Sequence, residues 1–320
     1  MSSVLDSATG DGFVAYHADT IDVAKGLPSE SVDFSVFSPP FSSLFTYSSS
    51  DRDLGNVRND AEFFAHYRFL ADEQFRVMKP GRLVAAHCML LPASKQNDGF
   101  IGLKDFRGDL IRIYQAAGFV FHAEVCIWKD PVVAMQRTKA LGLLYKQLKK
   151  DSTRSRMGIP DYVVIMRKPG DNAVPVGQDE KLFPVEMWQR YASPVWASLA
   201  GFDDEGFAIC VNPTPSNPGG IDQSDTLQAR SARENDDERH LCPLQLEVIR
   251  RCVRLYSNPG EVVWSPFMGI GSEGVVSLEA GRRFIGAELK ASYYRQAVAN
   301  LRAAESQKHA QGSLFAEAAL

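Results

Sequence analysis

The run Ser38-Pro39-Pro40-Phe41 combines groups that could hold a flat heterocycle by its amino group. Two consecutive prolines stiffen the backbone and remove two N–H donors, which leaves the carbonyls of Ser38 and Pro39 as rigid acceptors. Phe41 offers an aromatic face on which a ring, such as a base turned out of a nucleic-acid stack, could lie. An ordinary proline-rich turn has the same composition, so the run needs a second feature before it indicates a site.

A second run, Ser265-Pro266-Phe267-Met268-Gly269-Ile270-Gly271, carries two glycines that let the backbone approach a ligand closely. Glu288 follows Gly271 by 17 residues, and in nucleotide-binding sheets an acid near this place accepts the two ribose hydroxyls. The third glycine of a dinucleotide loop is absent, and Phe267 has no use beside a phosphate. A ligand with an adenosine part and a sulfonium cation fits better, because an aromatic ring attracts such a cation by about 0.5–2 kcal/mol. Taken alone, the run is also typical of a tight strand-to-helix turn.

Alternating strands and helices are expected to position both runs. Period-two or continuous apolar segments predict strands, and apolar residues spaced by three and four predict the helices between them. The alternation predicts an α/β fold with a doubly wound, mostly parallel sheet, in which ligands bind beyond the carboxyl ends of the strands. Both runs directly follow such ends. The expected strands are 32–37, 82–89, 119–128, 162–166, 261–264 and 284–288, and the expected helices are 61–78, 104–117, 244–256, 272–280 and a last one ending near 304.

Two segments interrupt this alternation. The segment 131–160 is basic and partly helical near 134–148: between Lys129 and Lys168 ten Lys and Arg stand against three Asp, although the chain has a net charge of −4. The segment 169–236 is rich in Pro, Gly, Asn and Asp, and a loop of that length is uncommon in a compact domain, so an inserted subdomain is expected. The expected divisions are 13–168, 169–236, 237–305 and a flexible tail at 306–320.

Composition argues against several classes of protein. No apolar stretch is long enough to span a membrane, and the N-terminus lacks a secretory signal. The five cysteines are widely spaced without a Cys-x-x-Cys pair, which argues against structural zinc and suits a reducing cytoplasm. Cys88 and Cys126 lie in apolar runs and are predicted to be buried core thiols. We therefore expect a cytoplasmic protein with no metal and no membrane association.

Together the two runs resemble a pair of motifs in the amino-methylating DNA methyltransferases. Ser38-Pro39-Pro40-Phe41 resembles their catalytic motif, in which Asp, Ser or Asn precedes Pro-Pro and an aromatic residue. The run from Ser265 to Gly271 resembles their Asp-Pro-Phe-x-Gly-x-Gly cofactor loop. The catalytic motif comes first here, as in the β-class of that family. The resemblance covers residues 13–168 and 236–303, and it implies a methyltransferase sheet with 169–236 as the target-recognition region.

Further residues take roles that this resemblance implies. Asp19 resembles the acid that binds the cofactor adenine, although a solvated loop acid would look the same. The segment 239–245 resembles the part that contacts the methionine end of the cofactor. Ser265 departs from the usual Asp and keeps a hydroxyl without the charge. The cofactor, S-adenosyl-L-methionine, is therefore expected to contact Asp19, His240, Pro243, Ser265, Pro266, Phe267, Gly269, Gly271 and Glu288.

The activity that the resemblance implies is methyl transfer to the exocyclic amine of a flipped base in double-stranded DNA. Hydrogen bonds from the amine to Ser38 and the Pro39 carbonyl would localise its lone pair, so that positioning carries the reaction without a covalent intermediate. Ser at the first catalytic position resembles the cytosine-N4 enzymes, whereas adenine-N6 enzymes of this class usually have Asp. Cytosine N4 is therefore favoured, and adenine N6 stays open. DNA phosphates are expected to contact Arg137, Lys139, Lys146, Lys149, Lys150, Arg154 and Arg156, although such a run can also be a solvated helix face.

Other activities fit the sequence less well. C5 methylation of cytosine needs a nucleophilic Cys, usually after Pro, and the chain has no Pro-Cys pair. RNA and protein methyltransferases usually place the cofactor loop before the catalytic loop, and a nicotinamide dehydrogenase would need the third glycine. A catalytically silent nucleic-acid-binding module stays open because of Ser265. A second copy of the chain and a cognate restriction endonuclease are both compatible with the resemblance as partners, and the sequence decides neither.

Overall fold

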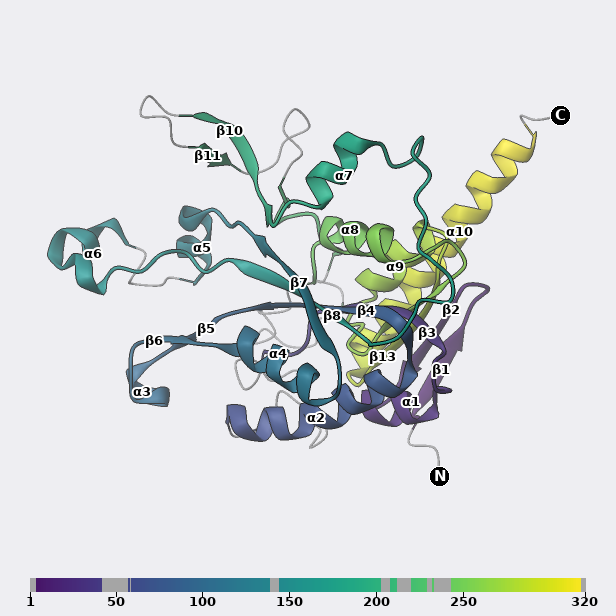
Figure 1. The fold of residues 1–320 in the computed structure, drawn as a ribbon, viewed down its shortest axis with the longest axis horizontal. Helices are drawn as coiled ribbons and strands as arrows, with labels where there is room; N and C mark the ends of the chain where they lie inside the picture. The colour runs from purple at the N-terminus through teal and green to yellow at the C-terminus, as the bar shows by residue number, and fades with distance from the viewer. Residues whose placement is uncertain are drawn as a thin grey trace.

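A computed structural model of the chain describes residues 4–41, 57, 59–138, 144–202, 208–211, 220–228, 232 and 243–317. Within these residues the centre is a nine-stranded sheet of order β1-β2-β13-β12-β3-β4-β8-β7-β9 (Figure 1). From β2 to β4 the neighbouring strands run parallel, and β8 and β7 continue the sheet antiparallel. The strands are β1 (Asp6–Thr9), β2 (Phe13–His17), β3 (Val32–Phe37), β4 (Met78–Met89), β7 (Val120–Ile127), β8 (Asp161–Arg167), β9 (Val195–Trp196), β12 (Val262–Ser265) and β13 (Arg283–Glu288).

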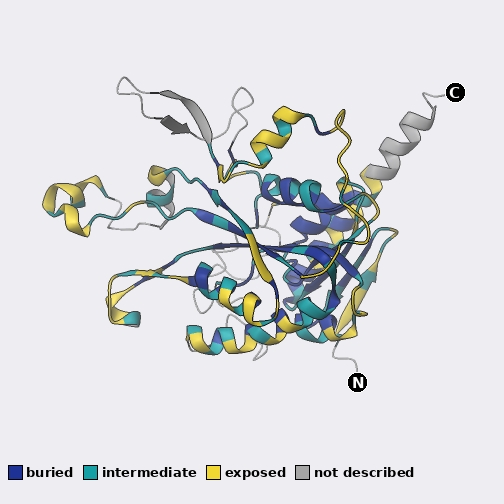
Figure 2. Ribbon diagram, viewed as in Figure 1, coloured by how far each residue is buried: buried dark blue, intermediate teal, exposed yellow. Residues whose placement is uncertain are grey.

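Helices cover both faces of this sheet, with α1, α2 and α4 on one face and α8, α9 and α10 on the other (Figure 1). Side chains alternate between the two layers along β3: Phe34 packs with Val248 of α8, whereas Phe37 packs with Phe63 of α2. The central strands are accordingly buried on both faces (Figure 2). This confirms the predicted doubly wound α/β fold. The covering helices are α1 (Thr20–Gly26), α2 (Asp60–Val77), α4 (Phe106–Ala116), α8 (Leu246–Tyr256), α9 (Ser272–Glu279) and α10 (Ala291–Glu317).

Local signals explain where several elements begin and end. Asn59 accepts a hydrogen bond from the Glu62 N–H at 2.9 Å and so caps α2. Asp105 caps α4 in the same way, which starts that helix at Phe106 and not at the predicted Lys104. Lys104 instead ends β6 (Gly102–Lys104), which forms a small hairpin with β5 (Leu91–Ala93) beside the short α3 (Lys95–Asp98).

Other boundaries differ from the prediction. The strand predicted at 82–89 begins earlier: β4 starts at Met78 and includes residues 79–81, because the pairing with β3 absorbs them as an irregularity between Val32 and Phe34. The last helix does not end near 304: α10 runs to Glu317, since no proline interrupts it. Cys88 is buried as predicted. Cys126 is only half-buried, because β9, the strand that pairs with this end of β7, is two residues long.

The basic segment forms two short helices where one was predicted near 134–148. α5 (Pro131–Thr138) and α6 (Tyr145–Lys150) are joined by residues 139–143, which lie outside the described residues. The short 3₁₀ helix η4 (Ser152–Arg154) follows α6. We call the basic segment 131–160 the arm, and its described part extends away from the body of the molecule (Figure 1). None of the helices in the described ranges is long and apolar enough to cross a membrane.

The described part of 169–236 is attached to the main sheet. It holds α7 (Val185–Tyr191), β9 and a hairpin of β10 (Ser198–Phe202) with β11 (Ala208–Val211). β9 pairs parallel with β7 and adds the last strand of the sheet. Trp196 of β9 is buried, and the guanidinium of Arg251 on α8 lies 4.9 Å from the centre of its ring. The segment therefore shares a core with the rest of the domain.

Candidate active site

The carboxyl end of β3 holds the run that begins with Ser38. β3 is buried along its whole length, Ser38 is the first residue beyond it and is half-buried, and Pro39 and Pro40 are buried. β3 pairs with β12 on one side and with β4 on the other. Because Phe37 pairs with Ala86 of β4, the next residue on each strand brings Ser38 beside His87.

A line of polar side chains lies behind Ser38. The Ser38 Oγ is 3.2 Å from Nδ1 of His87, and Nε2 of His87 is 3.2 Å from Oδ2 of Asp161. Lys129 Nζ donates to the other carboxylate oxygen of Asp161 at 2.5 Å. His87 Nε2 makes no hydrogen bond to the described residues, so its contact with Asp161 is an electrostatic pair.

Both inner members of this line are shielded from solvent. His87 is 8% exposed and Asp161 is 2% exposed. Burial by itself raises the pKa of Asp161, but the charges of Lys129 and His87 lower it more, and the net pKa lies below the ordinary value for Asp. Asp161 is therefore a carboxylate near neutral pH and presents a negative charge to the far side of the His87 ring.

Aromatic rings hold the two predicted runs side by side. The Phe267 ring lies 5.8 Å from that of Phe37 and stacks on that of Tyr67 at 6.4 Å. Phe41 lies edge-on to Phe106 at 5.9 Å, and both Phe41 and Phe267 pack against the same core cluster. The runs after β3 and β12 therefore meet at one rim of the sheet, as the prediction requires.

The cofactor loop is shaped by its backbone. Gly269 and Gly271 have φ of +52° and +92°, in the left-handed region that side chains disfavour. A Cβ at Gly269 would meet no atom of the described residues within 4 Å, whereas one at Gly271 would lie 3.3 Å from Ala297 Cα. Asn300 donates to the carbonyl of Ile270 at 2.8 Å and fixes the loop against α10.

Glu288 ties the cofactor loop to the end of β13. Its Oε2 accepts from the Gly269 N–H at 3.0 Å, and its Oε1 accepts from the Lys290 N–H at 2.8 Å. These contacts orient the carboxylate against the loop, at the position where the sequence predicts a ribose-binding acid, and that role stays a prediction.

The other predicted cofactor residues are placed unequally. Asp19 caps α1 by accepting from the Ile21 N–H at 2.8 Å, so it has a structural role at the end of β2. Pro266 is buried, and so is Ser265, whose hydroxyl has no hydrogen-bond partner among the residues that the structure describes. Pro243 lies just before α8, and His240 lies outside the described residues.

Glu273 is a second buried carboxyl group at this rim, and the sequence analysis did not single it out. It is the second residue of α9 and is 4% exposed. Burial raises its pKa to about 8, its own backbone N–H lowers the pKa, and the charge of Glu288 raises it further. Glu273 is therefore mostly protonated at neutral pH.

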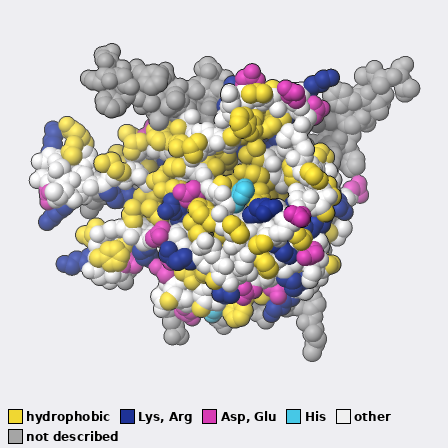
Figure 3. Space-filling view, viewed as in Figure 1, with side chains coloured by type: hydrophobic (Ala, Val, Ile, Leu, Met, Phe, Trp, Pro, Cys, Tyr) yellow, Lys and Arg dark blue, Asp and Glu magenta, His cyan; other side chains and the backbone are white. Residues whose placement is uncertain are grey.

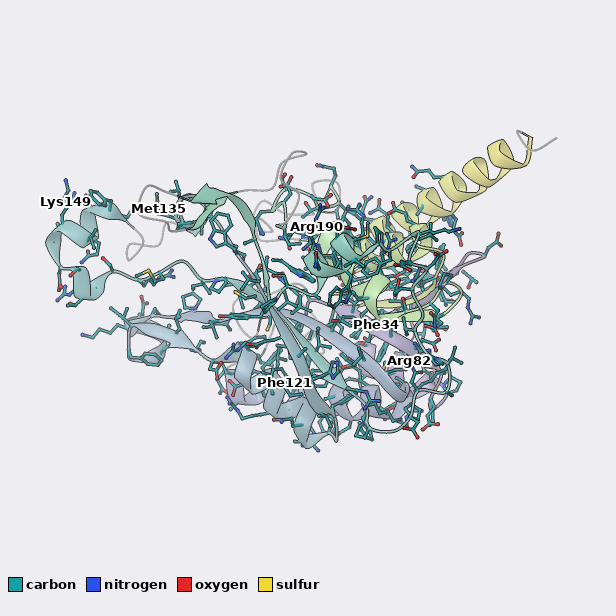
Figure 4. All side chains as sticks on the ribbon, turned by 45° about the horizontal axis from the view of Figure 1, so that its top comes forward. Phe34, Arg82, Phe121, Met135, Lys149 and Arg190 are labelled. Carbon is teal, nitrogen blue, oxygen red and sulfur yellow. The ribbon has the colours of Figure 1, made fainter. Side chains whose placement is uncertain are left out.

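The predicted DNA-contacting residues gather on the arm. Lys146, Lys149 and Lys150 of α6 are exposed, and Figure 4 places Lys149 at the tip of the arm, far from Arg82. Lys and Arg side chains stand on the part of this arm that faces the viewer in Figure 3. Arg154 is exposed and pairs with Asp151 at 3.2 Å, and Arg156 is half-buried. Arg137 lies on α5 with its side chain undescribed, and Lys139 lies outside the described residues.

His87, Asp161 and Lys129 are not among the site residues predicted from the sequence. A signal was present: His87 is a polar residue near the end of the predicted strand 82–89, Lys129 directly follows 119–128, and Asp161 directly precedes 162–166. What the sequence lacked was the antiparallel pairing of β4 with β8, which sets Asp161 opposite Met89, two residues beyond His87. No group of three His, Cys, Asp or Glu within the described ranges is arranged to hold a metal ion.

The sequence profile of the DNA methylase family matches residues 32–299, which include both runs and the segment between them. The chain belongs to the DNA methylase family. Among curated proteins, this DNA methylase is 24% identical over 285 residues to the type II methyltransferase M.BglII of Bacillus subtilis, over 87% of this chain and 66% of that protein. It covers about a fifth of the length of three further curated relatives.

Solved structures share the fold of this DNA methylase. A putative DNA modification methylase from Thermus thermophilus, complexed with S-adenosyl-L-methionine, superposes with a TM-score of 0.59 at 20% identity, over 89% of this chain and 91% of that one. The PvuII DNA methyltransferase, described as cytosine-N4-specific, superposes with a TM-score of 0.60 at 16% identity, over 92% and 87%. At these identities the likeness establishes the fold.

Proposed function

We propose that this DNA methylase transfers a methyl group from S-adenosyl-L-methionine to the exocyclic amine of a base flipped out of double-stranded DNA. The observation that carries the proposal is the position of Ser38 at the rim of the sheet, beside the glycine loop that follows β12. A methyl donor and an amine acceptor held by these two loops would be neighbours, and bringing reactants together is the largest requirement of a direct displacement.

The loop after β12 suits a cofactor with an adenosine and a methionine part. When bound, S-adenosyl-L-methionine supplies a methyl group on a sulfonium sulfur. Gly269 has no side chain to block the ligand, and Glu288, held against the loop by the Gly269 N–H, is placed at the end of β13 to bind the ribose hydroxyls. The buried Ser265 hydroxyl would contact a polar group of the ligand. Asp19, His240, Pro243, Pro266, Phe267 and Gly271 complete the proposed cofactor site.

The loop after β3 suits the amine. Its buried prolines have no N–H to offer, so the Ser38 hydroxyl and the Pro39 carbonyl are left to accept from the amino group. These contacts would concentrate the lone pair on nitrogen, and Phe41 would stack on the base. A serine hydroxyl is a neutral acceptor, which favours N4 of cytosine as the target, with N6 of adenine as the alternative.

The exposed cations of the arm are proposed to hold DNA by its phosphates. Lys146, Lys149 and Lys150 are exposed on α6, and the arm that carries them projects from the body of the molecule (Figure 1). Such contacts supply affinity that does not depend on sequence. Arg137, Lys139, Arg154 and Arg156 are proposed to add to them, and residues 169–236 are proposed to recognise the target sequence.

The setting of the activity is also a proposal. Relatives named as type II methyltransferases favour a role in a restriction-modification system with a cognate endonuclease, in the cytoplasm. A homodimer would let two copies methylate both strands of a symmetric site. Size-exclusion chromatography with light scattering measures the number of copies directly, and a monomer at all concentrations would contradict the dimer.

Methyl transfer tests the proposal directly. The purified chain is incubated with tritiated S-adenosyl-L-methionine and duplex DNA, and the DNA is digested to nucleosides that are identified by mass. We expect N4-methylcytosine. N6-methyladenine would change the target base and keep the reaction class. Label in RNA or protein but not in DNA would overturn the proposal, and cofactor binding without any transfer would identify a silent module.

A further inference from the structure

We propose that Ser38, His87 and Asp161 form a path that takes up the proton released by the target amine, with His87 as a positioning residue that acts through Ser38. The inference rests on the proposed function, because it assigns the fate of a proton in that reaction. It adds two residues, from β4 and β8, to a site that the motifs confine to the loops after β3 and β12.

The contacts form a continuous line along the rim of the sheet, from the end of β3 across β4 to β8. Ser38 Oγ lies 3.2 Å from His87 Nδ1, and His87 Nε2 lies 3.2 Å from Asp161 Oδ2. Lys129 holds Asp161 from its other oxygen at 2.5 Å, so the carboxylate is fixed on two sides. Ser38 directly follows β3, His87 lies in β4 and Asp161 begins β8, and because these strands are neighbours in the sheet, strand pairing sets the spacing of the three residues.

The reaction leaves a proton that must go somewhere. As the bond from nitrogen to the methyl carbon forms, the bond from that carbon to sulfur breaks, and its electron pair stays on sulfur. The amine nitrogen then carries one proton too many. In the proposed path this proton moves to Ser38 Oγ while the Ser38 proton moves to His87 Nδ1, which gives an imidazolium beside the Asp161 carboxylate. The charge is balanced, and solvent later takes the proton from His87.

The path needs one particular form of the His87 ring. Nδ1 must be free to accept from the Ser38 hydroxyl, so the ring hydrogen must be on Nε2, the atom that faces Asp161. A carboxylate on that side stabilises both this tautomer and the imidazolium that forms later. The lowered pKa of Asp161 keeps it charged for this purpose.

A serine, a histidine and an aspartate in line can also activate the serine as a nucleophile, but the residue after Ser38 argues against that use here. Hydrolases of that kind bind the developing oxyanion with backbone N–H groups, commonly including that of the residue after the nucleophile. Pro39 has no N–H. The line is therefore better suited to moving a proton than to acyl transfer.

The groups around His87 define what a pH profile of methyl transfer would report. Asp161 of β8 and, behind it, Lys129 after β7 are the charged groups placed against its outer side, and Ser38 of β3 is on its inner side. Cys88, the next residue of β4, packs into the opposite core, and burial raises the pKa of its thiol. A change of rate with pH that depends on His87 is thus separable from this thiol.

A double-mutant cycle tests the path. Single-turnover methyl transfer is measured for the wild type, Ser38→Ala, His87→Asn and the double variant. General acid–base steps contribute about 10²- to 10⁴-fold, so we expect His87→Asn to slow transfer by about 100-fold with cofactor and DNA affinities within about twofold. Because His87 acts through Ser38, the double variant should be no slower than Ser38→Ala. Losses that multiply in the double variant would overturn the path.

The pH profile provides a readout that a structural role would not move. A protonated imidazole cannot accept a second proton, so the path predicts an acid limb in the pH profile of wild-type transfer. His87→Asn should lose this limb, and Asp161→Asn should shift it. An unchanged acid limb in His87→Asn would overturn the path. Tyr114→Phe, which removes a buried hydroxyl bonded to Gln74 at 2.6 Å, is the matched control and should keep the limb.

Nitrogen-15 spectra of the histidine rings test the path without any reaction. The free chain should show the Nε2–H tautomer for the ring that disappears in His87→Asn, and Nδ1–H would overturn the path. Failure of the proposed function has a different signature: a wild type that binds cofactor and DNA but transfers no methyl group. Normal transfer by His87→Asn would instead overturn the proton path and leave the proposed function standing.

Discussion

The two loops that meet at the rim are held in place by different means. The loop after β12 is held by its own backbone: left-handed glycines, a carboxylate that binds a glycine N–H, and Asn300 on a loop carbonyl. The loop after β3 is held by side chains from other elements, through His87 of β4 behind Ser38 and through the ring of Phe106 of α4 against Phe41. The first can be recognised in a contiguous stretch of sequence, and the second depends on residues 49 positions away or more.

The largest expected effect is a loss of methyl transfer on substitution in the loop after β3, with cofactor binding by the loop after β12 retained. Ser38→Ala should lower the rate of methyl transfer by roughly 10²- to 10³-fold, because it removes a hydrogen-bond partner placed for the reacting group. Cofactor affinity, measured by calorimetry, should stay within about twofold, and Phe41→Ala should behave alike. Ser31→Ala is a matched control, since the Ser31 hydroxyl binds the Pro28 carbonyl away from the rim. Parallel losses of transfer and cofactor binding would indicate a folding defect.

A substitution in the loop after β12 should instead weaken cofactor binding. Gly271→Val forces a branched side chain to φ of +92° and against Ala297, and strain of about 1–3 kcal/mol at such a position corresponds to a loss of up to about 100-fold. We expect cofactor binding to weaken by about 10- to 100-fold. Gly26→Ala, where a Cβ would meet nothing within 4 Å, is the control. Normal cofactor titration by Gly271→Val would remove the assignment of this loop.

A third variant asks whether DNA binding is independent of both loops. Neutralising Lys149, Lys150, Arg154 and Arg156 together should weaken DNA binding, and it should lower the slope of log affinity against log salt by about 0.9 for each phosphate that the variant no longer neutralises. Cofactor affinity should not change. Binding measured by fluorescence anisotropy at several salt concentrations gives the slope. An affinity and slope equal to those of the wild type would indicate that the arm is a solvated surface that does not bind DNA.

The smallest expected effect concerns the buried carboxyl group beside the backbone-held loop. The pKa of Glu273 is raised to about 8, so the folded chain binds a proton that the unfolded chain releases near pH 4.5. Stability contributed by this proton is present at low pH and is lost as pH rises toward 8. Glu273→Gln, which mimics the protonated form, should raise the melting temperature by a few degrees at pH 8–9 and by little near pH 5. A gain of equal size at both pH values would contradict the assignment.

The sequence predicted the parts of the fold that depend on residues close together in the chain. The apolar segments at 32–37 and 284–288 gave strands close to their observed bounds, and the glycine run gave the strand-to-helix loop. The position of both runs after strand ends predicted their meeting at one rim, which the parallel pairing of β12 with β3 confirms, and the family profile over residues 32–299 confirms the family. These predictions succeeded because parallel strands present their carboxyl ends together.

The sequence did not predict what depends on pairing between distant strands. His87 and Asp161 meet because β8 returns antiparallel to β4, and nothing near either residue encodes that register. The segment 79–81 has the composition of a turn, yet pairing with β3 keeps it in a strand. Asp19 matched a cofactor acid by position, and the structure shows that it also caps α1. His240 and Lys139 lie outside the described residues, so their predicted roles stay predictions.

The strand β9 limits how this chain could be re-engineered. Since Val195–Trp196 completes the sheet beside β7, a chimera that exchanges all of 169–236 for a relative's segment would also remove the outermost strand and expose an apolar edge. A graft that begins after Trp196 would keep the strand and its stacking on Arg251. Chimeras joined after Trp196 should therefore stay monodisperse, whereas chimeras that exchange all of 169–236 should aggregate.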